Sequence, residues 1–172
     1  MKMKLFLSAV IAAIPFLFGR ADAAGSKVLH AFNGNDGNEP TWLLEANDGT
    51  LWGVTFLGGG SGLGDGVLYK IDRARNFTVV HTFTDRPDGS LPNKLIQASD
   101  GTIYGLSASG GANFGGTVYK VSTTGSYSIL HSFNPVTEGS GPSHLIQASD
   151  GFFYGTAGVA GIPDPNCSNH EP

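Results

Sequence analysis

The sequence predicts an all-β protein made of small four-stranded antiparallel sheets, and three observations lead to this prediction. A unit of about fifty residues recurs along the chain, which is typical of repeat architectures. An Asp-Gly pair, which favours tight hairpin turns, recurs at the same place in every unit. The 172 residues include 26 glycines, about twice the usual share of ~7%, and no window has the apolar period of a helix.

The repeat consists of three segments that align in register. Each segment begins with a His-x-Phe pattern, continues with Pro-x-x-Leu and reaches Asp-Gly and then a Tyr-Gly or Trp-Gly pair. The leading histidines are His30, His81 and His131. We therefore expect tandem repeats over residues 24–161, with copies at about 28–78, 79–128 and 129–161.

Four short strands are expected in each copy, and the second copy shows them in order. Residues 77–83 alternate between two faces, as a half-buried strand does. Residues 94–98 are apolar, and the Asp-Gly turn leads from them into a returning strand over 102–106. After a loop of small residues, 117–121 form the last strand. The pattern thus predicts that 77–83 is the first strand of the second sheet.

Four antiparallel strands in about fifty residues match one blade of a β-propeller, in which small sheets pack face to face around an axis. Pro40, Pro92 and Pro142 precede the second strand of each copy, where no ladder hydrogen bond is lost. A β-solenoid-like array is the alternative. Solenoid coils are usually shorter and contain no hairpin of this kind, so we favour the propeller.

The predicted propeller is incomplete, with two full repeats and a partial third. The last strand of the third copy is expected near residue 166, where the sequence is polar and follows Pro163 and Pro165, which oppose strand pairing. Residues 162–172 are therefore interpreted as an irregular tail. The chain is either truncated relative to a longer parent, one of several copies that complete a ring as a homo-oligomer, or an open array with exposed end faces.

Residues 1–23 are interpreted as a signal peptide. Lys2 and Lys4 precede an apolar stretch that is too short for a membrane span, and small residues follow around Ala23. We expect cleavage after Ala23, no membrane span after its removal, and a secreted, extracellular, cell-surface or periplasmic protein. Cys167 is the sole cysteine, so no internal disulfide is expected. The formal net charge is −4, and such an acidic chain is not expected to bind nucleic acid.

The recurring motifs resemble the Gloeobacter and Verrucomicrobia tandem repeat of exported bacterial proteins. The resemblance rests on His-x-Phe, Pro-x-x-Leu-Ile-Gln-Ala-Ser-Asp-Gly, Tyr-Gly and Gly-x-Val-Tyr-Lys-Val, and it covers residues 28–161. It implies a secreted or surface-attached protein with no assigned enzymatic activity. The chain departs from this family in its small number of copies. It resembles kelch repeats in length and in the Gly-Gly loop, but less in residue order.

Several repeated residues have both a structural and a functional interpretation. The three histidines favour hydrogen-bonded packing between blades, with a symmetric zinc or nickel site as the alternative. The repeated aspartates favour capping of their own turns over catalysis. Calcium binding in the oxygen-rich loops 33–39 and 58–66 is a further alternative. Aromatic residues are the candidate ligand contacts, either stacking on a sugar or packing between blades: Trp42, Trp52, Tyr104 and Tyr154.

We therefore expect a non-catalytic exported repeat protein that acts as a secreted or surface interaction scaffold, with an unknown protein or glycan partner. The variable loops carry its specificity in this hypothesis. A lectin-like carbohydrate-binding module is the first alternative and a hydrolase the second. Because Asp65, Asp72, Asp85, Asp88 and Glu138 look scattered and without a paired base, we expect no catalytic residue, cofactor or resident metal.

Overall fold

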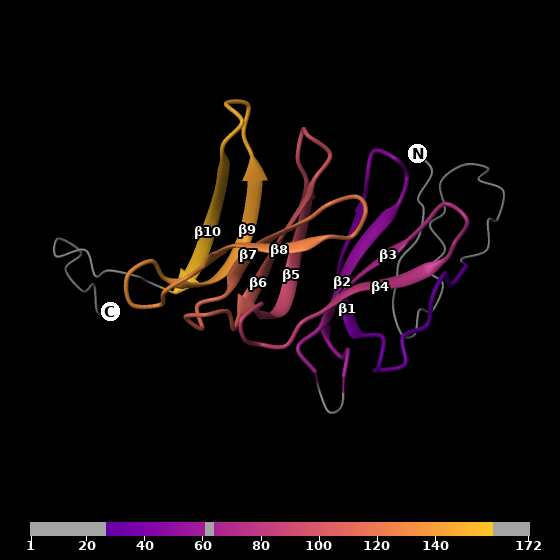
Figure 1. The fold of residues 1–172 in the computed structure, drawn as a ribbon, viewed down its shortest axis with the longest axis horizontal. Helices are drawn as coiled ribbons and strands as arrows, with labels where there is room; N and C mark the ends of the chain where they lie inside the picture. The colour runs from indigo at the N-terminus through magenta and orange to yellow at the C-terminus, as the bar shows by residue number, and fades with distance from the viewer. Residues whose placement is uncertain (1–26, 61–63, 160–172) are drawn as a thin grey trace, which may run out of the picture.

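The computed structural model describes residues 27–60 and 64–159. Every regular element in this part of the chain is a β-strand (Figure 1). The strands are β1 (Asn38–Glu45), β2 (Leu51–Leu57), β3 (Val67–Ile71), β4 (Phe77–Thr82), β5 (Ser90–Gln97), β6 (Ile103–Ser109), β7 (Thr117–Val121), β8 (Tyr127–Ser132), β9 (Ser140–Gln147) and β10 (Phe153–Val159). No helix in these residues is long and apolar enough to span a membrane. The predicted signal peptide 1–23, Cys167 and the tail 162–172 lie outside the described residues.

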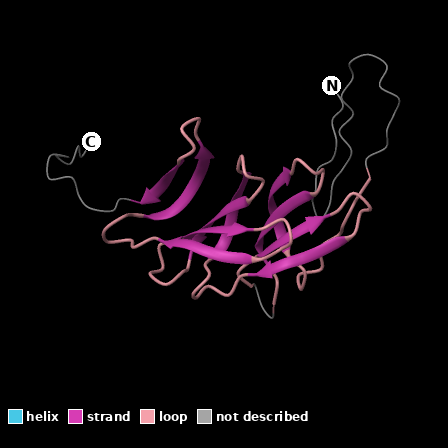
Figure 2. Cartoon of the chain, turned by 45° about the horizontal axis from the view of Figure 1, so that its top comes forward, coloured by secondary structure: helices cyan, strands magenta, loops and turns pink. Residues whose placement is uncertain are grey.

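The strands form three antiparallel sheets that stand in a row (Figures 1 and 2). The first sheet has the order β1-β2-β3-β4 and the second β5-β6-β7-β8, while β9 and β10 form a two-stranded third sheet. Each sheet is an up-and-down meander in chain order. The arrangement confirms the predicted four-stranded blades, two complete and one partial, and the row is not closed into a ring.

The Asp-Gly hairpins are confirmed in all three sheets. The glycine after each aspartate has a positive φ: 80° at Gly49, 84° at Gly101 and 85° at Gly151. Only glycine adopts this left-handed conformation without steric cost. In the second sheet the turn is closed by the amide of Ala98, which donates to the carbonyl of Thr102 at 2.9 Å. The repeated Asp-Gly pair therefore fixes the register of the first two strands in each blade.

The prediction that residues 77–83 open the second sheet is wrong, because this segment is the outer strand of the first sheet. β4 pairs with β3, with Val79 opposite Tyr69. A tight turn between these strands, in which Asp72 N–H donates to the carbonyl of Asn76 at 3.1 Å, returns the chain directly to β3. The repeat in the sequence therefore begins one strand earlier than the sheet does.

The matching residues of the first copy, 29–32, do not form a strand. They lie instead on the side of the first sheet that faces away from the second. The ring of Phe32 packs edge-on against Tyr69 and Phe77, with centroid distances of 5.1 and 5.7 Å. This contact places His30 and Phe32 on the sheet in the same way that His81 and Phe83 are placed on the second sheet.

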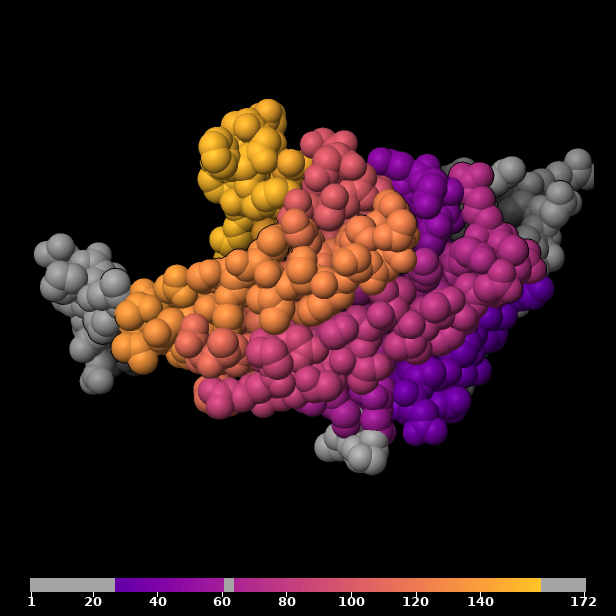
Figure 3. Space-filling view, in the orientation of Figure 1, coloured from indigo at the N-terminus to yellow at the C-terminus, as the bar shows by residue number. Residues whose placement is uncertain are grey.

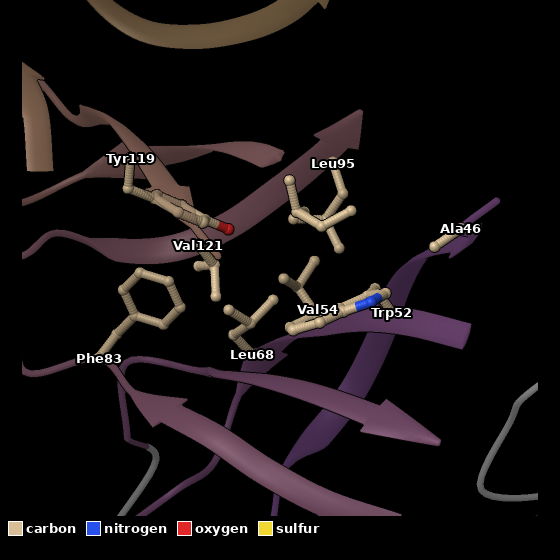
Figure 4. Close-up of a cluster of buried hydrophobic side chains, with 9 residues drawn as sticks. Ala46, Trp52, Val54, Leu68, Phe83, Leu95, Tyr119 and Val121 are labelled. Atoms are coloured by element: carbon tan, nitrogen blue, oxygen red, sulfur yellow. The ribbon is translucent and has the colours of Figure 1, made fainter. Parts of the chain in front are cut away.

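The main hydrophobic core lies between the first and second sheets (Figure 4). Both sheets contribute large side chains that are removed from water, and this burial is the principal favourable term in holding the sheets together. The first sheet and the residue after it contribute Ala46, Trp52, Val54, Leu68 and Phe83; the second contributes Leu95, Ile103, Tyr119 and Val121.

The second and third sheets pack in the same way as the first and second. The side-chain oxygen of Gln97 accepts a hydrogen bond from the amide of Asn47 in the preceding sheet, at 2.8 Å. Gln147 accepts the equivalent bond from the amide of Ser99, also at 2.8 Å. Because an identical contact recurs at the same place, the spacing between neighbouring sheets is a property of the repeat.

Candidate functional site

The repeated aspartates cap their own hairpin turns, as the sequence predicts. One carboxylate oxygen of each residue accepts a hydrogen bond from the amide two residues later. The donor–acceptor distances are 2.8 Å at Asp48, 2.9 Å at Asp100 and 2.9 Å at Asp150. The bond from the Thr50 amide lowers the pKa of Asp48, and that from Phe152 lowers the pKa of Asp150. A carboxylate used in this way is a poor proton donor.

The repeated histidines each bond a carboxylate in the loop that follows. The Nε2–H group donates to Asp36 from His30 at 2.8 Å and to Asp88 from His81 at 2.6 Å. The third pair, His131 and Glu138, has a distance of 3.1 Å. The view that Asp88 and Glu138 have no paired base is therefore wrong. The sequence signal that we overlooked is an acid six or seven residues after each repeat histidine.

Aromatic rings pack against each of these imidazoles, and the first two are also stacked. His30 stacks on Phe77 with centroids 3.6 Å apart, and His81 stacks on Tyr127 at 3.8 Å, both with the rings tilted by only 4°. Each repeat histidine also makes a T-shaped contact with the phenylalanine two residues later, with ring centroids 4.9 Å apart. His81 thus packs between the first and second sheets, whereas His30 packs the segment before β1 onto the outer side of the first sheet.

The alternative of a symmetric metal site finds no support in the described residues, where no three His, Cys, Asp or Glu side chains gather in metal-binding geometry. In loop 33–39 the side-chain oxygens bind the loop itself. Asn33 Oδ1 accepts from the amides of Asn35 and Asp36, and Asp36 Oδ1 accepts from the amide of Asn33 at 2.9 Å. The calcium hypothesis for 58–66 includes residues 61–63, which lie outside the described residues.

Trp52 lies in the core rather than at the surface. Its side chain is only 2% exposed between the first two sheets, so we remove it from the candidate ligand contacts. Trp42 is half-buried at the same interface, where its indole N–H donates to the carbonyl of Leu95 at 3.0 Å. The ammonium of Lys94 lies 3.7 Å from its ring centroid. Both tryptophans therefore join neighbouring sheets.

Tyr104 and Tyr154 occupy the position of Trp52 in the next two sheets. Tyr104 is half-buried and packs against Phe153 of the third sheet at 4.4 Å. Tyr154 is 52% exposed, and its hydroxyl donates to Asp150 at 2.8 Å. Tyr154 is the one candidate of the four that the described structure leaves open to a ligand.

The third sheet carries an exposed apolar surface. The tip of its hairpin projects beyond the hairpin of the second sheet (Figure 3). Large apolar side chains are exposed on it: Ile146, Phe152, Phe153 and Tyr154. Phe153 faces Tyr104 of the second sheet, whereas Ile146 and Tyr154 are cross-strand neighbours on the other face. Apolar residues that lie together in this way mark a contact surface.

A small hollow of about 180 Å³ on the second sheet has a different character. It is lined by Thr102, Lys120, Ser122, Ser126 and Ser128. This lining contains hydroxyls and one ammonium group but no carboxylate or imidazole. The hollow therefore offers no acid–base pair of the kind that general acid–base catalysis requires.

Comparison with known proteins agrees with this repeat geometry. The sequence pattern of the Gloeobacter/Verrucomicrobia repeat matches residues 18–165. The chain belongs to this repeat family. The residues matched by the Gloeobacter/Verrucomicrobia repeat include all three repeated histidines and all three repeated aspartates described above. No match is found among curated proteins.

Solved structures of similar fold are β-propellers. Virginiamycin B lyase from Staphylococcus aureus superimposes with a TM-score of 0.51 at 17% identity, over 72% of this chain and 36% of the lyase. A streptogramin B lyase gives a TM-score of 0.49 at 18% identity, over 74% of this chain and 42% of that one. The chain thus spans about a third of the first lyase, and this likeness shows the fold alone.

Proposed function

We propose that this Gloeobacter/Verrucomicrobia repeat chain is an exported, non-catalytic interaction scaffold. The observation that supports it best is the recurrence of the polar contacts. Each repeated aspartate caps a turn, and each repeated histidine bonds a loop carboxylate. Enzymes gather non-repeating acids, bases and nucleophiles in one pocket, whereas a contact present in every copy serves the architecture.

Within the part of the chain that the structure describes, the pair formed by His81 and Asp88 most resembles a catalytic dyad. Its Asp88 carboxylate accepts a second hydrogen bond from the hydroxyl of Thr84, at 2.7 Å. The imidazole lies flat on Tyr127. His30 and His131 make the equivalent hydrogen bond to a loop carboxylate. A structural role explains all three pairs at once, which favours the scaffold over a hydrolase.

The lectin-like alternative depends on Tyr154. Aromatic rings bind sugars by stacking, and an exposed ring beside a carboxylate suits this purpose. The other three candidate aromatic residues pack between neighbouring sheets: Trp42, Trp52 and Tyr104. A glycan site built from several repeats therefore has little support. The lectin-like alternative therefore rests on a single exposed tyrosine in the third sheet.

The proposal is tested on protein recovered from the medium of a secreting host, whose mass checks cleavage after Ala23. We expect no turnover of virginiamycin B by mass spectrometry and no signal on a glycan array. Turnover that is lost in His81→Gln, with the β-rich circular dichroism spectrum retained, would overturn the scaffold role in favour of an enzyme. A glycan signal that is lost in Tyr154→Ala, but retained in the matched control Tyr127→Phe, would overturn it in favour of a lectin.

A further inference from the structure

The two ends of the row of sheets expose different faces. On the third sheet the outward face carries Ile146 and Tyr154, which lie opposite each other in the register; we call this the trailing face. Ile146 is 59% exposed. On the first sheet the outward face carries Leu43, Glu45 and Leu51, with Glu45 opposite Leu51; we call this the leading face.

Inside the chain, faces of these two kinds are packed against each other. Trp52 occupies the position of Tyr154, and the second sheet covers it completely. Leu95 and Ile103 of the second sheet occupy the positions of Leu43 and Leu51. They are fully buried against the first sheet, whereas Leu43 and Leu51 are only half-buried. Each open face therefore has the composition of a face that is covered elsewhere in the same molecule.

A segment of the chain covers part of the leading face. Leu29 and Phe32 pack against the cluster that contains Tyr69. This contact lies on the outer side of the sheet, where Leu43 and Leu51 of the leading face flank the same cluster together with Phe77 and Val79 of β4. It leaves Glu45 exposed on β1, where the corresponding Gln97 of the second sheet receives the preceding hairpin.

The polar groups at the two open faces match as well. Gln97 and Gln147 each accept a hydrogen bond from the hairpin amide of the preceding sheet, donated by Asn47 and Ser99. Ser149 is the corresponding hairpin residue of the third sheet, and Glu45 occupies the glutamine position of the first. A carboxylate accepts an amide hydrogen bond more strongly than a neutral amide oxygen does.

We propose that two copies of this chain associate head to tail, with the trailing face of one on the leading face of the other and Glu45 accepting the amide of Ser149. A second copy is the occupant because one chain carries both faces of an interface that it already forms twice internally. Such a heterologous contact continues into a ring or a filament. The inference is independent of the proposed scaffold role, since an enzyme or a lectin with the same open faces would associate in the same way.

Sedimentation equilibrium of the purified protein tests this association. We expect a mass that rises above that of one chain as the protein concentration increases. Ile146→Lys buries an unpaired ammonium in the contact and should weaken association by at least about a hundredfold. Val136→Lys is the matched control, because Val136 is 76% exposed on the loop between β8 and β9 and belongs to neither face as defined here. A parent protein that stays monomeric, or equal effects of the two substitutions, would overturn the proposal.

A mixing experiment tests the head-to-tail geometry. Glu45→Lys places an ammonium against the Ser149 amide and should weaken self-association by about tenfold or more. The Glu45→Lys chain keeps a sound trailing face, and the Ile146→Lys chain keeps a sound leading face. Their mixture should therefore form a dimer with the affinity of the parent contact and grow no further. A mixture that stays monomeric, or Glu45→Lys chains that associate like the parent, would show that the faces do not meet in this way.

Discussion

His81 shows at the scale of a single residue how the fold uses a polar side chain. Its Nε2–H donates to Asp88, one ring face lies on Tyr127, and Phe83 makes a T-shaped contact beside the ring. His131 has the equivalent carboxylate and phenylalanine, but its side chain is more exposed. The two histidines have the same local motif. They differ because the next sheet supplies Tyr127 as a stacking partner to His81.

His81→Ala is expected to lower the free energy of unfolding by about 2 kcal/mol, because it removes an aromatic stack and one of the two side-chain hydrogen bonds to the buried Asp88 carboxylate. His131→Ala should cost less than about 0.5 kcal/mol, as expected for an exposed pair. Urea denaturation followed by circular dichroism measures both. Equal losses for the two variants would contradict the role of the stack.

The single blade is held in register by a tyrosine that lies on a glycine. Tyr119 on β7 is opposite Gly105 on β6, and a Cβ atom at Gly105 would collide with the phenol ring. Tyr69 and Gly53 repeat this contact in the first sheet. Burial raises the pKa of the Tyr119 hydroxyl well above its ordinary value.

Gly105→Ala is expected to lower the free energy of unfolding by about 1–3 kcal/mol, the usual cost of overpacking a core. The fully buried ring of Tyr119 has no room to retreat. Gly158→Ala is the control, because the nearest atom to its added Cβ is 3.6 Å away. Thermal unfolding of both variants measures the difference, and an unchanged midpoint for Gly105→Ala would contradict this packing.

The whole molecule is a stack in which each sheet completes the previous one. One sequence position shows this, because its exposure increases from Trp52 through Tyr104 to Tyr154. The residue type changes little along this series, but the amount of neighbouring sheet decreases. Burial at this position is therefore set by the neighbour and not by the residue.

Trp52→Ala is expected to cost about 3–5 kcal/mol of stability, as for other large-to-small changes of buried aromatic residues. Tyr154→Ala should cost less than about 1 kcal/mol. Both are measured by denaturant unfolding in dilute solution, where contacts between chains are absent. If the two variants were equally destabilised, the stacked arrangement would be in doubt.

The sequence predicts the local structure of this chain better than its grouping into sheets. Asp100 and Gly101 specify a turn through their own conformational preferences, so the hairpin could be predicted without knowledge of distant contacts. The assignment of residues 77–83 failed because strand pairing depends on the short turn between β3 and β4. A repeating sequence shows the length of its unit but not the residue at which each sheet begins.

The candidate site was predicted less well, for a related reason. Trp52 and Tyr154 are equivalent in sequence, and only the presence of a covering sheet distinguishes a core residue from an exposed one. The pairing of His81 with Asp88 was missed because the acid is aspartate in two copies and glutamate in the third, with a spacing that varies by one residue. The capping role of the aspartates was confirmed, since it depends on adjacent backbone amides alone.

The one-strand offset between repeat and sheet determines where this protein can be divided. A fragment that ends at residue 78, where the first sequence copy ends, lacks most of β4 and leaves β3 as an unprotected edge prone to aggregation. A fragment that ends at residue 85 retains all four strands together with Phe83. Domain swaps and fusions therefore belong in the linker between β4 and β5, even though the repeated motif has its boundary elsewhere.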